Sequence, residues 1–201
     1  MTLLCILKFP KLNLMKQKIA KFILRVLGWK VIFNVPADTK KFVVLMAPHT
    51  SNWDFMLGWV GYMSLGVQSK YLMKKEAFVF PLNLILKAMG ALPVDRKAST
   101  NVVIQVGDMF KNTGSLVITI TPEGTRSLNR NWKRGFYYIA EHAQVPIALG
   151  FLDYKNKTGG IGGIFVPTGD YDADLKQIEA FYYDKQARHP EKFNLSLQNR
   201  K

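Results

Sequence analysis

Residues 42–54 of this chain read FVVLMAPHTSNWD, an apolar run that passes directly into a short polar segment. The six apolar residues over 42–47 are typical of a buried β-strand. Either Ser51 or Asn52 can cap a helix that begins immediately afterwards, because short polar side chains accept hydrogen bonds from the first free N–H groups of a helix. The segment therefore predicts a strand, a turn that contains His49, and a helix.

The same alternation of short β-type runs and helical patterns continues along the chain. We expect strands at 31–34, 42–46, 70–73, 92–94, 116–120, 146–152 and 164–167, and helices at 53–65, 77–89, 100–111, 135–143 and 173–188. This alternation predicts an α/β fold with a mixed, mostly parallel sheet flanked by helices. A chain of 201 residues fits one such domain and leaves little room for a second.

Four glycines lie close together over 159–163. They do not fit the dinucleotide-binding fingerprint, because its third glycine would fall at Phe165 and no helix follows. We expect a hairpin or a tight loop at this position.

A basic amphipathic helix is predicted near the N-terminus. Lys18, Lys21 and Arg25 share one side of this helix. The apolar residues of the other side recur at three- and four-residue steps and are Leu12, Met15, Ile19, Phe22, Ile23 and Val26. Such a helix can lie in the headgroup layer of a membrane, or it can pack on the core with a solvated lysine face. No apolar stretch of eighteen or more residues is present, so we expect no transmembrane helix.

The charge balance points to an anionic partner. Lys and Arg total 28 against 14 for Asp and Glu, which gives a net charge of +14, and 48% of the residues are hydrophobic. A membrane surface or an acidic lipid accounts for both values together, whereas a dedicated nucleic-acid binder is usually less hydrophobic. The single cysteine, Cys5, excludes an internal disulfide and a cysteine-cluster metal site.

His49 and Asp54 are candidates for acid–base chemistry. They lie five residues apart in the turn between the predicted strand and helix. An imidazole in this setting can take a proton from a hydroxyl, while the carboxylate fixes its tautomer and stabilises the imidazolium. No G-x-S-x-G nucleophile elbow is present, which favours direct transfer to a bound hydroxyl over a covalent intermediate.

Two further motifs follow predicted strands and contain arginines. One reads TPEGTRS over residues 121–127, and the other reads GALPVDR over residues 90–96. Arg126 and Arg96 can supply two guanidinium forks for a phosphate. Glu123 is expected to hold an arginine or a substrate hydroxyl, since an acid beside an anion site is otherwise unfavourable. Because ligands bind at the carboxyl ends of parallel strands, we expect these motifs to face one cleft.

The order of four motifs resembles the lysophospholipid acyltransferases, the glycerolipid group that includes 1-acylglycerol-3-phosphate acyltransferase. The motifs are H-x-x-x-x-D, G-x-x-x-x-D-R, P-E-G-T-R-S and Val145-Pro146-Ile147, and the resemblance extends over residues 42–151. The resemblance implies transfer of a fatty acyl group from acyl-CoA or acyl carrier protein to a lysolipid hydroxyl, with no metal or other cofactor. It also implies that His49 is the general base with Asp54 as its partner, that Arg96, Glu123, Gly124, Thr125 and Arg126 bind the acceptor's phosphate, and that Pro146 shapes the cleft.

This interpretation divides the chain into a membrane-associating segment over 1–34 and an acyltransferase domain over 35–201. It implies a peripheral or monotopic enzyme at the cytoplasmic face of the bacterial inner membrane, with no nucleic acid as a partner. Three alternatives remain open at this point. The acceptor can be a phosphate-free lysolipid of the lyso-ornithine type, water can replace the lysolipid so that the chain is a thioesterase, or the chain can be a non-catalytic lipid- or nucleic-acid-binding protein.

Overall fold

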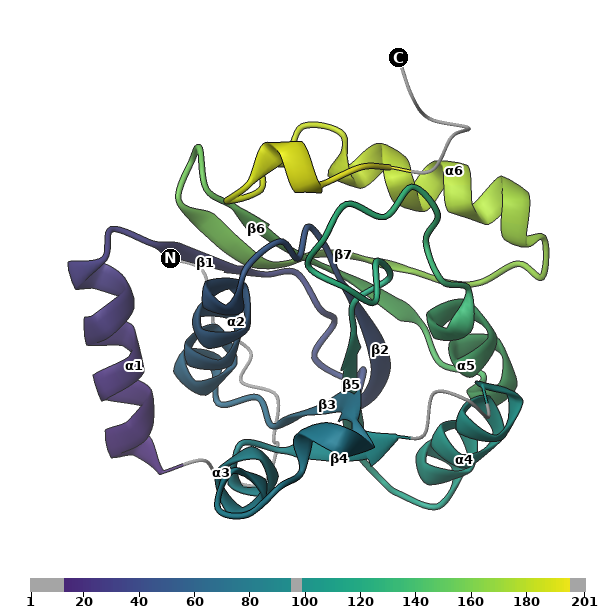
Figure 1. The fold of residues 1–201 in the computed structure, drawn as a ribbon, viewed down its shortest axis with the longest axis horizontal. Helices are drawn as coiled ribbons and strands as arrows, with labels where there is room; N and C mark the ends of the chain where they lie inside the picture. The colour runs from purple at the N-terminus through teal and green to yellow at the C-terminus, as the bar shows by residue number, and fades with distance from the viewer. Residues whose placement is uncertain (1–12, 95–98, 196–201) are drawn as a thin grey trace.

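A computed structural model describes residues 13–94 and 99–195 and arranges them around a seven-stranded sheet (Figure 1). The strands are β1 (Lys30–Phe33), β2 (Lys41–Met46), β3 (Ser69–Lys74), β4 (Ala91–Val94), β5 (Leu116–Ile120), β6 (Ile147–Asp153) and β7 (Thr158–Phe165). The helices are α1 (Leu14–Val26), α2 (Asn52–Leu65), α3 (Leu82–Ala88), α4 (Ser99–Lys111), α5 (Gly135–Ala143) and α6 (Tyr171–Tyr182), with 3-10 turns η1 (Lys75–Ala77) and η2 (Pro190–Lys192).

The strand order is β1-β7-β6-β2-β5-β3-β4. All the pairings among β6, β2, β5, β3 and β4 are parallel, β7 is antiparallel to β6, and β1 is parallel to β7. The expected mixed, mostly parallel α/β sheet is confirmed. β2 lies in the middle of this order, and the turn that follows it contains His49.

The sheet has a hydrophobic core on each face, and β2 contributes to both. Val43 and Leu45 point into the core that α4, α5 and α6 cover, whereas Phe42, Val44 and Met46 point into the core beneath α2. This alternation follows from the two-residue period of a strand. Because both faces are covered, the strand reads as a continuous apolar run, as the sequence does over 42–47.

The glycine cluster lies inside β7, which forms an antiparallel hairpin with β6 whose turn is at 154–157. The expected hairpin is therefore present, but a tight loop at 159–163 is wrong. Gly160 has a φ of +130°, and a Cβ atom there would lie 1.9 Å from the carbonyl oxygen of Ile32 on the neighbouring strand β1. A Cβ atom on Gly162 would lie 2.4 Å from the ring of Phe181 on α6. The glycines therefore allow close packing of a strand and a helix against β7 rather than a turn.

Two predicted helices differ from those observed. The helix expected over 77–89 is divided into η1 and α3, and α3 begins only after Pro81. Proline lacks the N–H that a continuous helix needs at this position. The helix expected over 173–188 ends at Tyr182.

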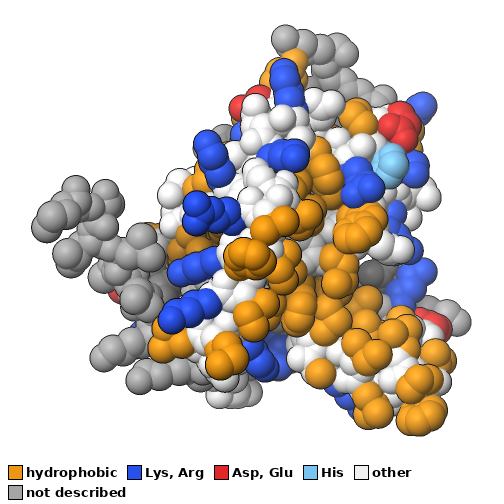
Figure 2. All heavy atoms as spheres, turned by 90° about the vertical axis from the view of Figure 1, so that its left-hand side faces the viewer, with side chains coloured by type: hydrophobic (Ala, Val, Ile, Leu, Met, Phe, Trp, Pro, Cys, Tyr) orange, Lys and Arg blue, Asp and Glu red, His pale blue; other side chains and the backbone are white. Residues whose placement is uncertain are grey.

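Helix α1 packs on α2 at the outside of the molecule and is amphipathic as predicted (Figure 1). Ala20 and Leu24 are buried, whereas Leu14, Met15, Phe22 and Val26 are strongly exposed. Figure 2 shows hydrophobic side chains on this face of the molecule, with lysine and arginine side chains along one edge. No helix in residues 13–94 and 99–195 is long and apolar enough to span a bilayer. β1 belongs to the sheet although it lies within the 1–34 segment, so within residues 13–34 of that segment α1 is the element that can meet a lipid surface.

Candidate active site

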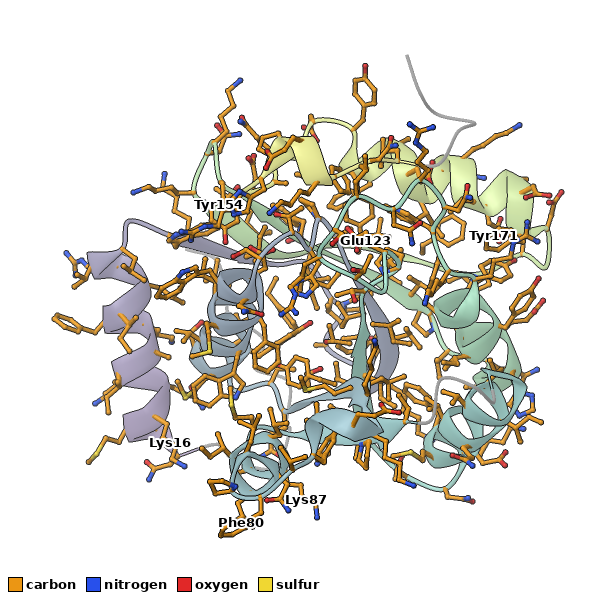
Figure 3. All side chains as sticks on the ribbon, in the orientation of Figure 1. Lys16, Phe80, Lys87, Glu123, Tyr154 and Tyr171 are labelled. Carbon is orange, nitrogen blue, oxygen red and sulfur yellow. The ribbon has the colours of Figure 1, made fainter. Side chains whose placement is uncertain are left out.

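Three neighbouring strands end at the candidate site. His49 follows β2, Glu123 follows β5 and Tyr154 follows β6, and the three strands are adjacent and parallel. Because the carboxyl ends of parallel strands meet at one edge of a sheet, these side chains come together although His49 and Tyr154 lie 105 positions apart in sequence. Figure 3 labels Glu123 and Tyr154, which both lie on the upper side of the molecule in that view.

The start of α2 fixes the turn that carries His49. Ser51, one of the two residues predicted as a cap, is the N-cap, and its hydroxyl oxygen accepts a hydrogen bond from the N–H of Trp53 at 3.2 Å. The Oδ2 atom of Asp54 accepts hydrogen bonds from the N–H groups of Thr50 at 2.6 Å and Ser51 at 2.7 Å. Asp54 thereby satisfies the backbone of the turn directly after His49.

Asp54 is close to His49 without being its hydrogen-bond partner. The distance from His49 Nδ1 to Asp54 Oδ2 is 3.7 Å, which is beyond hydrogen-bond range. The side chain of Asp54 is buried, and both of its oxygens already accept hydrogen bonds from other groups. The negative charge of Asp54 therefore acts on the imidazole at short range, while the backbone and Tyr154 hold the carboxylate in place.

The environment of His49 favours the neutral imidazole. Burial lowers the pKa of His49 below its usual value, the charge of Asp54 raises it in part, and the positive charge of Arg126 lowers it further. The imidazole side chain is still 19% exposed. A neutral imidazole that remains accessible can accept a proton at neutral pH.

Tyr154 is a site residue that the sequence did not indicate. Its hydroxyl donates a 2.6 Å hydrogen bond to Oδ1 of Asp54, and burial raises the pKa of the phenol, so that it remains a donor. Its ring meets the ring of Trp29 edge to face, with 5.1 Å between centroids. Tyr154 directly follows a strand at the edge where the motifs lie, which is the one signal that could have identified it.

Glu123 is buried beneath His49. Its Oε1 atom accepts a 3.0 Å hydrogen bond from the backbone N–H of His49. Its Oε2 atom has no hydrogen-bond partner among the described residues. Burial raises the pKa of Glu123 to about 8, while hydrogen bonds from the backbone oppose the increase and the charge of Asp54 adds to it. The expected arginine partner is not found in the described part of the chain, and the carboxyl group holds the backbone of the histidine instead.

The loop after β5 lies next to the start of α2. The guanidinium of Arg126 donates a hydrogen bond to the side-chain oxygen of Asn52, which is the first residue of α2. Thr125 and Arg126 are exposed, and Gly124 adopts a φ of +64° in a turn closed by its N–H and the carbonyl of Thr121. The loop thus presents a cation and a hydroxyl beside His49.

Arg96 and Pro146 are the remaining residues expected at this site. Arg96 lies outside the described residues. The carbonyl of Pro146 accepts a hydrogen bond from the N–H of Val43, near the start of β2, whereas His49 follows the end of β2. Pro146 therefore lies toward the opposite edge of the sheet, and the structure does not bring it into a cleft with His49.

A cavity of about 750 Å³ adjoins the loop after β5. Thr121 and Gly124 line it, together with apolar side chains of α4 and α5 such as Val102, Phe136 and Ile139. This volume is within the range of small-molecule sites. The lining suits an apolar chain whose polar end lies near the loop. No group of three or more His, Cys, Asp or Glu side chains within 13–94 and 99–195 is placed to hold a metal ion.

Comparisons with known proteins agree with the motifs. Residues 30–148, more than half of the chain, match the family model described as Acyltransferase. The chain is 32% identical over 104 residues to human 1-acyl-sn-glycerol-3-phosphate acyltransferase beta, and this match covers 48% of the chain and 37% of the human protein. The chain therefore spans little more than a third of the length of that relative. The fold is similar to the crystal structure of the 1-acyl-sn-glycerophosphate acyltransferase PlsC from Thermotoga maritima, with a TM-score of 0.57, 18% identity, and coverage of 83% of this chain and 75% of that one.

Proposed function

Because the chain belongs to the acyltransferase family, we propose that it transfers a fatty acyl group from an acyl thioester to the hydroxyl of a lysophospholipid such as 1-acylglycerol-3-phosphate. The thioester is acyl-CoA or acyl carrier protein. The observation that carries the proposal is the placement of an accessible, neutral His49 beside buried Asp54, next to the Arg126 loop and an apolar cavity. This arrangement combines a base, a cationic group and space for an acyl chain.

The proposed reaction needs no group beyond the two substrates and the side chains of this site. The acceptor's hydroxyl oxygen attacks the thioester carbonyl carbon while the imidazole nitrogen that faces away from Asp54 takes the hydroxyl proton. Collapse of the tetrahedral intermediate breaks the carbon–sulfur bond, and the leaving thiolate takes the proton from the imidazolium. The products are an ester and a free thiol, and His49 is regenerated without any metal or redox cofactor.

The charges of the loop favour a phosphorylated acceptor. Arg126 is exposed and lies beside the turn that carries His49 through its contact with Asn52. A guanidinium binds phosphate with two parallel hydrogen bonds. In this proposal Arg126, Thr125 and the backbone around Gly124 bind the phosphate, and Arg96 assists.

The proposed partner surface is an anionic membrane. The net charge of +14 and the exposed apolar residues of α1 suit an anionic leaflet, to which each well-placed Lys or Arg adds about 1 kcal/mol of attraction. The proposal therefore places the enzyme at the cytoplasmic face of a bacterial inner membrane, as a peripheral or monotopic protein.

The direct test is thiol release from acyl-CoA in the presence and absence of lysophosphatidic acid. We expect release to depend on the acceptor and to fall strongly when a phosphate-free lysolipid replaces it. Release that ignores the acceptor would identify a thioesterase. Equal rates of release with lysophosphatidic acid and with the phosphate-free lysolipid would show that the site does not require a phosphate on the acceptor.

The variant Arg126→Ala is the matched control for this test. If Arg126 binds the phosphate, the variant raises the apparent KM for lysophosphatidic acid and leaves that for the phosphate-free acceptor nearly unchanged. Equal changes for both acceptors would show that the arginine acts on the fold of the loop instead.

Tyr154→Phe should lower kcat about tenfold, which corresponds to the loss of roughly 1.4 kcal/mol from one hydrogen bond to a charged group. The phenol also withdraws part of the negative charge of Asp54 from the imidazole. Its removal should therefore raise the pKa of His49 and move the acid limb of the kcat/KM profile to higher pH.

Tyr183→Phe provides the comparison for that variant, because Tyr183 is a half-exposed tyrosine at the end of α6. It should leave both kcat and the pH profile unchanged. A Tyr154→Phe protein with lower thermal stability but an unshifted acid limb would limit Tyr154 to a structural role.

A further inference from the structure

The segment between β3 and β4 carries an exposed apolar surface that the fold does not use. We call this surface the apolar tip, and its members are Val79, Phe80, Leu82, Leu84 and Ile85. Phe80 is 81% exposed and Leu84 is 59% exposed, whereas Leu86 is the side chain of α3 that is buried. Side chains of this size are seldom left in water in such a contiguous group unless they meet a partner.

The apolar tip and the apolar side of α1 appear on one face of the molecule. Figure 2 shows hydrophobic side chains over the middle of this face and again in its lower part, where α3 lies in Figure 1. Lys16 on α1 and Phe80 on the tip are both at the lower end of the molecule in Figure 3. Phe22 of α1 is 67% exposed, so both elements present large apolar groups to solvent.

Basic residues surround both elements. Lys74, Lys75 and Lys87 flank the apolar tip, and Glu76 is the one acidic residue within 75–88. The polar side of α1 contributes Lys18, Lys21 and Arg25. Apolar groups flanked by cations match the interface of an anionic bilayer, with acyl chains below and charged headgroups above. A second copy of this chain carries the same positive charge, so self-association through this face is disfavoured.

The apolar tip is also placed where a lipid-using site needs it. η1 begins where β3 ends, so the segment leaves the sheet at the carboxyl edge of the parallel strands. His49 and Glu123 lie at the same edge, after β2 and β5. A membrane contact at the start of this segment therefore lies at the edge of the sheet that carries His49 and Glu123.

We propose that residues 75–88 form a second membrane-inserting element, which acts together with α1 to attach the protein to an anionic bilayer at two points. Phe80 and Leu84 enter the acyl-chain boundary, and Lys74, Lys75 and Lys87 bind headgroups. The inference rests on the membrane partner proposed above, but it does not depend on which reaction the site catalyses.

Vesicle co-sedimentation tests this element without any substrate. The protein is mixed with vesicles of phosphatidylglycerol and phosphatidylethanolamine, and the lipid concentration for half-maximal binding is measured. We expect the double variant Phe80→Ser/Leu84→Ser to need at least about tenfold more lipid than the wild type, because two large apolar side chains no longer leave water. Val166→Ser is the control, since Val166 is 69% exposed on the loop between β7 and α6. It should bind like the wild type.

A fluorophore at position 80 tests insertion directly. Cys5 is the single cysteine, so Phe80→Cys in a Cys5→Ser background accepts one environment-sensitive label. We expect a strong increase in its emission on adding anionic vesicles and little change with phosphatidylcholine vesicles. Binding of the double variant at wild-type lipid concentrations, or a label that stays in water, would overturn the proposal.

Two other results would assign the surface to a different partner and overturn the proposal equally. An apolar label environment that appears only as protein concentration rises would indicate a second copy of the chain. If the label is in an apolar environment at every protein concentration in the absence of vesicles, residues 1–12 cover the apolar tip. Thiol release with a short-chain, monomeric acceptor remains a separate assay, so a failure of the catalytic proposal is distinguishable from a failure at the membrane.

Discussion

His49→Ala should lower kcat/KM for acyl transfer by at least about a thousandfold, because removal of a general base typically costs two to four orders of magnitude. No other side chain at the site can replace it. Asp54 is buried with both oxygens occupied, and Glu123 binds the backbone of the same histidine with one oxygen. The measurement is acceptor-dependent thiol release, with vesicle binding and thermal unfolding recorded for the same preparation.

His142→Ala is the matched control for the loss of an imidazole. His142 is exposed on α5 and lies beside Asp108 and Lys111 of α4. This variant should transfer acyl groups at nearly the wild-type rate. If His49→Ala retained wild-type turnover while folded, the proposed mechanism would be wrong.

Glu123→Gln should make the protein more stable than the wild type at pH 9, with a difference that disappears toward pH 5. Burial raises the pKa of Glu123 from 4.5 to about 8. A raised pKa means that the stability contributed by the neutral carboxyl is fully present below about pH 4.5 and is lost as the pH rises through 8. At about 1.4 kcal/mol per pH unit, this loss reaches several kcal/mol in order of magnitude.

The glutamine variant isolates this effect because it stays neutral at every pH. Its side-chain oxygen can still accept the N–H of His49, so the turn keeps its hydrogen bond. The free energy of unfolding, measured in urea from pH 5 to pH 9, provides the comparison. Parallel curves for the two proteins would mean that the folded state accommodates a charged Glu123 at no cost.

Glu123→Ala serves as the contrasting variant. It removes the acceptor of the His49 N–H and leaves that group unpaired inside the protein. An unsatisfied buried donor costs about 1–3 kcal/mol. The alanine variant should therefore be less stable than the glutamine variant at every pH, which separates the hydrogen bond from the titration.

Much of the fold could be read from local sequence patterns. The apolar run over 42–47 and the cap at Ser51 predict β2 and α2 because strand burial and helix capping involve neighbouring residues. β7 could not be read in this way. Its glycines are required by Ile32 on β1 and Phe181 on α6, and those contacts exist only once the sheet order is known.

The candidate site divides in the same manner. The sequence predicts that His49, Glu123 and Arg126 lie at the same edge of the sheet, because each follows a predicted strand, and in the structure they follow β2 and β5. It did not indicate that Tyr154 bonds to Asp54, a contact across one hundred positions that depends on β6 lying beside β2. The sequence also could not show that Glu123 accepts a hydrogen bond from the backbone of His49. Every residue except proline has a backbone N–H, so no residue type marks this partner in the sequence.

The position of β2 has a consequence for anyone who wishes to redesign the acceptor range. β2 pairs with a strand on each side and is buried on both faces. Nearly every substitution in it therefore disturbs the packing of a core, whatever its effect on substrate binding. The loop after β5 carries Thr125 and Arg126, whose side chains are exposed and do not pack in either core. Substitutions that aim at new lipid specificities therefore belong in that loop, while the turn that carries His49 is held by a strand buried on both faces.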